Sequence, residues 1–292
     1  MRITVFTPSY NRGYIIKKLY DSLCRQTFRD FEWVVIDDGS TDNTEELFKS
    51  FSDDLFPITY VKVKNGGKHR AINKGVGLAQ GELFFIVDSD DYLTDTALEQ
   101  IDKVARSIPL SEKNEFAGVC GERGHTESAG IGTTFNGQYL DITMLERKKY
   151  GISGDKAEVF YTEVLKKYPF PEYEGEKFVT ECVVWDRIAH DGLKLRFFNE
   201  IVYICDYLPD GLTAKYEQLL WENPRGYGTY LYQSGEWGRY FGVQKWNQYL
   251  RYYYHYRKEL PFPEIARNLY QNPWNFWWRL LGLRLFYKLY DR

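Results

Sequence analysis

Short apolar runs alternate with stretches of helical periodicity through the first hundred residues. β-Rich runs occupy residues 3–6, 31–36, 59–63 and 83–87, and each of the first three is followed by apolar positions spaced three or four residues apart. This alternation is typical of parallel strands joined by helices that cover both faces of a sheet. We therefore predict an α/β fold with a Rossmann-like, mostly parallel sheet.

The hydrophobic pattern changes in the second half of the chain. Residues 114–150 are rich in glycine and only weakly periodic, so no element is assigned to them. Beyond them, the pattern predicts helices at 162–168 and 180–190 and strands at 195–198 and 201–205.

After Thr213 aromatic and basic residues become frequent, and six of the eight Trp lie between Trp221 and Trp278. We place a boundary there, between a domain of residues 1–213 and a helical, aromatic-rich C-terminal extension of residues 214–292.

Composition and charge narrow the function classes. A formal net charge of −3 provides no long-range attraction for nucleic acid, so no nucleic-acid partner is expected. The four cysteines have no C-x-x-C spacing, which is typical of reduced thiols in a cytoplasmic compartment. The chain has neither a basic and apolar leader at its start nor an apolar window of about 18 residues, so we expect no signal peptide and no membrane-spanning helix.

Polar residues follow the carboxyl ends of three predicted strands. Thr7 to Gly13 follow the first, Asp37 to Ser40 the second, and Asp88-Ser89-Asp90 the fourth. Each cluster alone would be an ordinary turn, but ligands of such sheets bind at this edge, where helix N-termini also point. Two carboxylates one residue apart can hold a hard divalent cation together with a substrate phosphate. Such a cation would neutralise a departing diphosphate.

Five motifs, in order and spacing, resemble the family 2 glycosyltransferases, which have the GT-A fold. The motifs are Thr7-Pro8-Ser9-Tyr10-Asn11-Arg12, residues 34–42, residues 65–75, Ala79-Gln80-Gly81-Glu82 and Asp88-Ser89-Asp90-Asp91. The resemblance implies an inverting transfer of a sugar from a nucleotide-sugar, a UDP-sugar in the first place, to an acceptor hydroxyl in polysaccharide or other cell-surface glycan biosynthesis. It also implies Mn²⁺ or Mg²⁺ as cofactor, a nucleotide-sugar-binding half at 1–110 and an acceptor-side half at 111–213.

The resemblance assigns roles on the donor side. Thr7, Pro8 and Tyr10 correspond to a loop that cradles the base, with Arg12 near the phosphates. Asp37 corresponds to the carboxylate that accepts the uracil N–H, with Asp38 as its neighbour. Lys68 and Asn73 match the third motif, where many relatives have an Arg in place of Ile72, so that Arg70 or Lys68 would replace it. Asp88 corresponds to the ribose-facing carboxylate and Asp90 to the metal ligand. Asp88 is also a second candidate ligand of the metal, and Ser89 is a candidate donor-binding residue.

An inverting transfer also needs a base that takes the proton of the acceptor hydroxyl. Glu181, six residues before Arg187, corresponds to the family's base position, and Glu176 competes with it. Glu181 has a second interpretation as a first-turn residue at a helix N-terminus capped by Thr180. Asp155 corresponds to an acceptor contact.

Two further stretches bear on the site. Residues 205–213 resemble the family's segment that folds over the diphosphate, but they lack the His that many relatives have, which leaves Asp210 as the candidate. His69, His125, His190 and His255 have no metal-ligand spacing, and we expect them to be packed or solvated.

The last residues repeat large apolar side chains at helical spacing on one side, with basic residues on the flanks. Two interpretations are open: the helix lies in the headgroup layer of a membrane, or it packs on the domain as core. A lipid-linked glycan acceptor would fit the first, with the protein cytoplasmic and peripheral at the inner face of the membrane. The pattern consists of Trp274, Trp277, Trp278, Leu281, Leu285 and Leu289, with Arg279, Lys288 and Arg292.

Two other functions are compatible with an α/β fold of this kind. A non-catalytic nucleotide-sugar or glycan-binding module would keep the fold without the carboxylates at the metal and base positions, and both are present. A sugar nucleotidyltransferase would have a Gly-rich, basic loop after the first strand, which residues 7–13 do not resemble.

Overall fold

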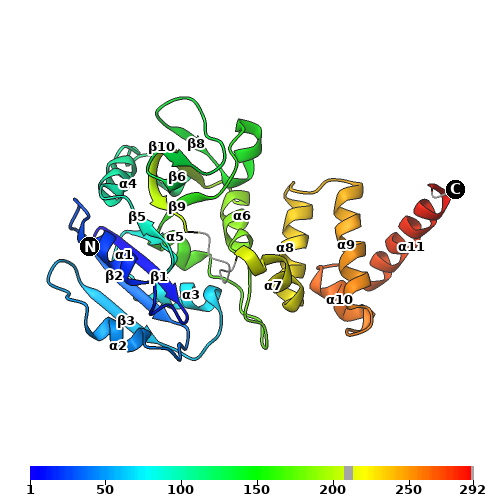
Figure 1. Cartoon of the computed structure of the whole chain (residues 1–292). Helices are drawn as coiled ribbons and strands as arrows, with labels where there is room; N and C mark the ends of the chain where they lie inside the picture. Colours follow the sequence, from blue (N-terminus) through cyan, green and yellow to red (C-terminus); the bar gives the residue numbers. More distant parts are fainter. Residues whose placement is uncertain (207–212, 291–292) are drawn as a thin grey trace.

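The computed structural model describes residues 1–206 and 213–290, with side chains as far as residue 283 of the last helix. Figure 1 shows two parts: a sheet covered by helices, which contains the N-terminus, and a row of helices that extends away from it to the C-terminus. The strands of the sheet follow the order β3-β2-β1-β4-β9-β6-β10-β5.

The first half of the sheet is parallel, as predicted. Strand β1 (Ile3–Ser9) lies between β2 (Phe31–Asp37) and β4 (Leu83–Ile86), and β3 (Ile58–Lys62) forms the edge. The predicted crossovers are helices, and they pack apolar side chains on the two faces of the sheet. They are α1 (Lys17–Cys24), α2 (Thr44–Lys49) and α3 (Lys68–Leu78).

The second half of the sheet is mixed. Strand β9 (Lys156–Tyr161) is antiparallel to β4 and to β6 (Phe116–Thr126), and β10 (Lys194–Ile204) is parallel to β6. Strand β10 joins the two strands predicted at 195–198 and 201–205, with register shifts between them. The remaining strands are β5 (Tyr92–Leu93), β7 (Ala129–Gly130) and β8 (Leu140–Ile142).

Strand β6 lies in the glycine-rich stretch to which no element was assigned. A Cβ at Gly118 would come within 2.0 Å of the carbonyl oxygen of Val159 on β9, so only glycine lets the two strands approach. Glycines required by the strand pairing therefore remove the alternation that would have indicated the strand.

Three more helices cover the domain. Helix α4 (Ala97–Arg106), which was not predicted, buries Leu98 and Ile101 against the sheet. Helices α5 (Thr162–Lys167) and α6 (Cys182–His190) confirm the predictions at 162–168 and 180–190. Short 3₁₀ turns at Lys113–Glu115, Met144–Tyr150 and Thr213–Lys215 connect the elements.

The C-terminal helices have an apolar core of their own, which includes Leu231, Tyr249, Tyr252 and Phe276. Each of these side chains is at most 1% exposed. The helices are α7 (Tyr216–Glu222), α8 (Pro224–Glu236), α9 (Val243–Tyr256), α10 (Phe262–Asn268) and α11 (Pro273–Tyr290). The boundary near residue 213 remains a prediction.

Helix α11 packs part of its aromatic and apolar side chains into the helical core, and its position at a membrane remains a prediction. Phe276 and Leu280 pack into the helical core, whereas Trp274, Trp277 and Trp278 are exposed. The side chains of Leu285, Leu289, Lys288 and Arg292 lie outside the described part. Among the described residues, no helix is long and apolar enough to cross a bilayer.

Candidate active site

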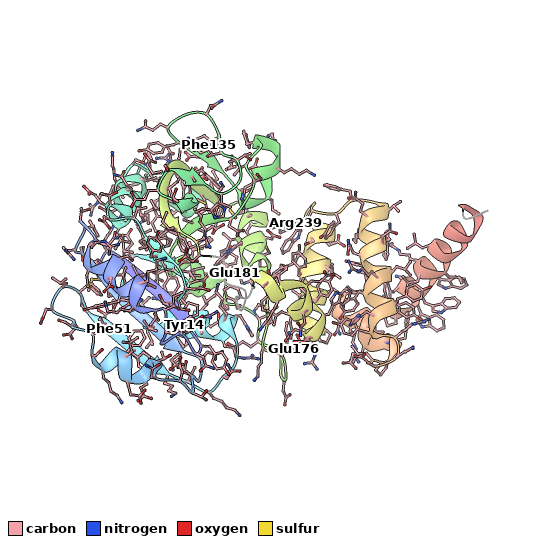
Figure 2. The ribbon with its side chains drawn as sticks, viewed as in Figure 1. Tyr14, Phe51, Phe135, Glu176, Glu181 and Arg239 are labelled. Carbon is pink, nitrogen blue, oxygen red and sulfur yellow. The ribbon has the colours of Figure 1, made fainter. Side chains whose placement is uncertain are left out.

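The polar clusters predicted for the ends of β1, β2 and β4 meet at one edge of the sheet, where α3 and α6 also begin. Lys68 is the first residue of α3, and Glu181 is the N-cap residue of α6. Figure 2 shows Glu181 near the middle of the molecule, between the sheet and the helical extension.

Lys68 joins two of the predicted functional carboxylates. Its Nζ lies 2.6 Å from Oδ1 of Asp88 and 2.8 Å from Oε1 of Glu181. Burial alone would lower the pKa of Lys68, but Asp88 and Glu181 outweigh it and raise that pKa, so the ammonium stays charged. In return, Lys68 and Arg123 lower the pKa of Asp88 against the opposing effect of burial.

Asp90 is the less neutralised member of the pair. Its carboxylate lies 3.7 Å from the guanidinium of Arg12, and burial together with the charge of Asp88 raises its pKa. A divalent cation would relieve this repulsion, and carboxylate oxygens are the ligands that Mg²⁺ and Mn²⁺ prefer. Asp88 and Asp90 therefore fit a divalent cation, which would supply positive charge to a phosphate group. Ser89 between them is buried.

A buried hydrogen-bond network holds the loop that carries these carboxylates, and sequence reasoning missed it. The Tyr203 hydroxyl accepts the backbone N–H of Asp88 at 2.9 Å and donates to Oδ2 of Asp91 at 2.7 Å. The other oxygen of Asp91 accepts the backbone N–H of Asp206 at 2.8 Å. Residue 206 directly precedes residues 207–212, so the loop is tied to the start of the predicted diphosphate-covering segment. That segment and Asp210 lie outside the described residues.

The two aspartates after β2 have different tasks. Asp37 is fully buried and accepts hydrogen bonds from the backbone N–H of Ser40 and from the Tyr60 hydroxyl. Asp38 accepts the backbone N–H groups of Gly66 and Gly67 at 2.7 and 2.8 Å, which fixes the loop that precedes Lys68. Asp38 thus acts on the loop, and the base-binding role of Asp37 remains a prediction.

The segment between β1 and α1 presents two exposed aromatic side chains, Tyr10 and Tyr14. Tyr10 is 49% exposed, and Pro8 is partly exposed. Thr7 is buried, and its hydroxyl accepts the indole N–H of Trp33 at 3.0 Å. Of the residues predicted to cradle the base, Tyr10 therefore has exposed ring surface for stacking, whereas Thr7 anchors the strand.

The residues of the third motif divide between site and scaffold. Asn73 forms a reciprocal pair of hydrogen bonds with the backbone of Phe170, both at 2.9 Å. Arg70 donates to the carbonyl oxygens of Gly66, Tyr173 and Glu176. Lys68, rather than Arg70, is thus the cation that faces Asp88.

The two candidate bases, Glu176 and Glu181, have different surroundings. Both oxygens of the Glu176 carboxylate accept backbone N–H groups at the start of α8, from Arg225 at 2.8 Å and Gly226 at 2.9 Å. Figure 2 shows Glu176 away from Glu181, on the side of α7 and α8. The Thr180 hydroxyl pairs with that of Tyr216, so it does not cap α6. The Glu181 carboxylate pairs with Lys68, and the Glu181 side chain is 38% exposed, so an acceptor can reach it.

The remaining predicted residues lie outside this cluster. Asp155 is exposed immediately before β9. His190 and His255 stack on Trp237 and Trp221. The described residues contain no group of three or more His, Cys, Asp or Glu side chains arranged to hold a metal by themselves.

Comparison with known proteins identifies the family. A profile described as "Glycosyl transferase family 2" matches residues 4–161, more than half of the chain. The chain belongs to glycosyl transferase family 2. It is 35% identical over 216 residues to "Glycosyltransferase GlyG" of Streptococcus pneumoniae, an alignment that covers 69% of each protein. It is also 37% identical to GlyA of the same organism over 102 residues, which are 35% of this chain but only 15% of that longer relative.

Solved structures extend the likeness to the whole chain. S. aureus TarS 1-349 in complex with UDP has a TM-score of 0.58 at 18% identity, covering 98% of this chain and 92% of the other. The mannosyltransferase PcManGT from Pyrobaculum calidifontis, in complex with GDP-Man and Mn²⁺, has a TM-score of 0.52 at 20% identity, covering 92% and 67%. At these identities the likeness concerns the fold, and the predicted GT-A fold is confirmed.

Proposed function

We propose that this family 2 protein transfers a sugar from a UDP-sugar to an acceptor hydroxyl, with inversion at the anomeric carbon. The observation that carries the proposal is the contact of Lys68 with both Asp88 and Glu181. It brings a carboxylate suited to a metal and diphosphate into the same charged cluster as a carboxylate suited to a base.

The donor is assigned to the loops at the ends of β1, β2 and β4. Asp88 and Asp90 would hold Mn²⁺ or Mg²⁺, which when bound supplies positive charge to the diphosphate. Arg12 and Lys68 add two cations at the same place, where charge develops on the leaving group. A UDP-sugar is favoured because Asp37 corresponds to the family's uracil acceptor, and TarS, which shares the fold, binds UDP.

Glu181 is proposed as the base. In the absence of substrate its charge is shared with Lys68, and a diphosphate beside Asp88 would attract that ammonium in its place. The freed carboxylate can then accept the proton of the acceptor hydroxyl as the oxygen attacks the anomeric carbon. Glu176 is not proposed, because the α8 backbone already occupies both of its oxygens.

The test is UDP release from UDP-glucose, UDP-galactose, UDP-GlcNAc and UDP-GalNAc, with Mn²⁺ and alkyl glycoside acceptors. Glu181→Gln should lower the turnover number by about two orders of magnitude or more while UDP binding, measured by calorimetry, is unchanged. Glu200→Gln, an exposed carboxylate on β10, is the matched control. Equal rates for Glu181→Gln and wild type would remove Glu181 from the mechanism.

The same panel separates the two alternative functions. A binding module would take up UDP-sugars without releasing UDP. A nucleotidyltransferase would release pyrophosphate from UTP and a sugar phosphate.

We further propose a lipid-linked glycan acceptor at an anionic membrane surface. The exposed Trp274, Trp277 and Trp278 supply interfacial side chains. The extension 214–292 contains twelve Lys and Arg against six Asp and Glu, in a chain that is acidic as a whole. The protein should cosediment with phosphatidylglycerol vesicles more than with phosphatidylcholine vesicles, and Ser at the three Trp positions should abolish binding. If the variant still binds phosphatidylglycerol vesicles, the proposed membrane-binding surface is refuted.

A further inference from the structure

A carboxylate on β9 remains unexplained by the proposed chemistry. Glu158 occupies the same strand face as Phe160, and Phe160 stacks on Trp185 of α6 with ring centroids 4.3 Å apart. Trp185 lies four residues after Glu181, one helical turn along the same helix face. Glu158, two residues before Phe160, therefore lies on the sheet beneath the start of α6, on the side of Glu181.

Two arginine side chains near Glu158 donate hydrogen bonds to backbone carbonyl groups. The Nε of Arg123 donates to the carbonyl oxygen of Lys156 at 2.7 Å, and Arg147 donates to that of Gly154. Neither forms an ion pair with Glu158, although their charges oppose the rise in its pKa that burial and Glu181 cause. The charge of Arg123 also lowers the pKa of Asp88.

Within the described part of the chain, the Glu158 carboxylate forms no ion pair, and the hydrogen bond that acts on its pKa comes from its own backbone. Its side chain is only partly buried, so the space above it is accessible. A partly buried carboxylate that has no donor from another residue takes further hydrogen bonds from water or from a ligand. The proposed diphosphate is assigned to the cations Lys68 and Arg12, so the part of the substrate that faces Glu158 is the sugar. A neutral ligand rich in hydroxyl donors, such as a sugar ring, has the matching chemistry.

We propose that Glu158 is a specificity-determining residue that accepts hydrogen bonds from hydroxyl groups of the sugar lying between Asp88 and Glu181. The inference rests on the proposed function and deepens it. A sugar hydroxyl would donate the hydrogen bond in either case. The sugar belongs either to the donor or to the acceptor.

The experiment uses Glu158→Ala and Glu158→Gln in the full chain, with Glu200→Gln as control. The donor arm compares UDP with the best UDP-sugar of the panel by calorimetry with Mn²⁺. If Glu158 binds the donor sugar, UDP affinity is unchanged while the UDP-sugar loses about ten- to a hundredfold in affinity. If it binds the acceptor, donor KM is unchanged while KM for the alkyl glycoside rises by a similar factor.

Deoxygenated sugars give a readout that a structural role would not change. Wild type should discriminate against the analogue that lacks the bound hydroxyl, and Glu158→Ala should lose that discrimination, with Glu158→Gln in between. If Glu158→Ala keeps the KM values and the discrimination of wild type, the inference about Glu158 is overturned, whatever the turnover number. The proposed function would not be affected by that result. Absence of UDP release by wild type with every donor would refute the proposed function and this inference with it.

Discussion

Lys68 balances the charge of the whole site, because it is the cation that contacts both Asp88 and Glu181. Its position follows from two local features. Asp38 fixes the loop before it through Gly66 and Gly67, and α3 begins at Lys68 itself. A rigid loop and a helix start thus deliver one ammonium group between two carboxylates from distant parts of the chain.

Replacement of Lys68 by Met should raise donor KM and lower the turnover number, together by about a hundredfold in kcat/KM. The cation that compensates the diphosphate is lost, and two carboxylates are left facing each other. Lys74→Met, an exposed lysine on the same helix, should behave as wild type. Steady-state UDP release measures both, and an unaffected kcat/KM for Lys68→Met would contradict the proposed charge balance.

His69 makes stability sensitive to acid. The imidazole is 1% exposed, and neither ring nitrogen has a hydrogen-bond partner among the described residues. Burial, with the charge of Arg70, lowers the pKa of His69 to about 4. The unfolded chain binds this proton near pH 6.5 and the folded chain does not, so the stability contribution is complete above that pH and is lost as the pH falls towards 4.

The free energy of unfolding should therefore fall by up to about 1.4 kcal/mol per pH unit between pH 6.5 and 4, relative to His69→Leu. Urea unfolding at a series of pH values measures the difference between the two proteins. Parallel pH profiles would show that His69 titrates normally in the folded state.

At the scale of elements, Glu176 stabilises the start of α8 from a loop of the catalytic domain. Its carboxylate binds two backbone N–H groups of the first turn, at the positive end of the helix dipole. Glu176→Gln should cost about 1–3 kcal/mol of stability, while the turnover number stays within a few-fold of wild type. Glu181→Gln should show the opposite pattern. Thermal unfolding and UDP release on both variants test the assignment, and a collapse of turnover in a folded Glu176→Gln would reverse it.

The elements that the sequence predicted well are those with one clear period. The parallel strands β1, β2 and β4 are buried apolar runs, and their crossover helices have apolar faces. Strand β9 was not predicted, because it carries Lys156 and Glu158 towards the interior beside other charged groups. Lys156 pairs with Glu122 on β6, which is distant in sequence, so no local pattern reveals the strand.

At the scale of the whole molecule, an ion pair between a buried aspartate and a partly exposed arginine joins α6 to the C-terminal helices. Asp186 on α6 is 1% exposed, and Arg239, which follows α8, donates to both of its oxygens at 2.7 and 2.6 Å. A pair with this geometry fixes how the helices of the extension pack against the helix that carries Glu181. The orientation of the base and of the extension are therefore linked.

Arg239→Met should destabilise the protein by about 3–5 kcal/mol, because Asp186 would remain buried without its partner. Asp186→Leu combined with Arg239→Met should recover much of that loss. Lys166→Met, which breaks an exposed pair with Glu163, should cost less than about 1 kcal/mol. Denaturant unfolding followed by Trp fluorescence checks all three, and equal losses for the single and double variants would contradict the argument.

The sequence by itself determined the parallel half of the fold and the polar strand ends, because each depends on local periodicity and on chemistry within a few residues. It also indicated Glu181 as the catalytic base, with Glu176 as the alternative. Only the tertiary structure separated these two carboxylates, since it brings α8 to Glu176 and Lys68 to Glu181. The same holds for Tyr203, whose hydroxyl contacts Asp88 and Asp91 more than one hundred residues away, a proximity that no local pattern encodes.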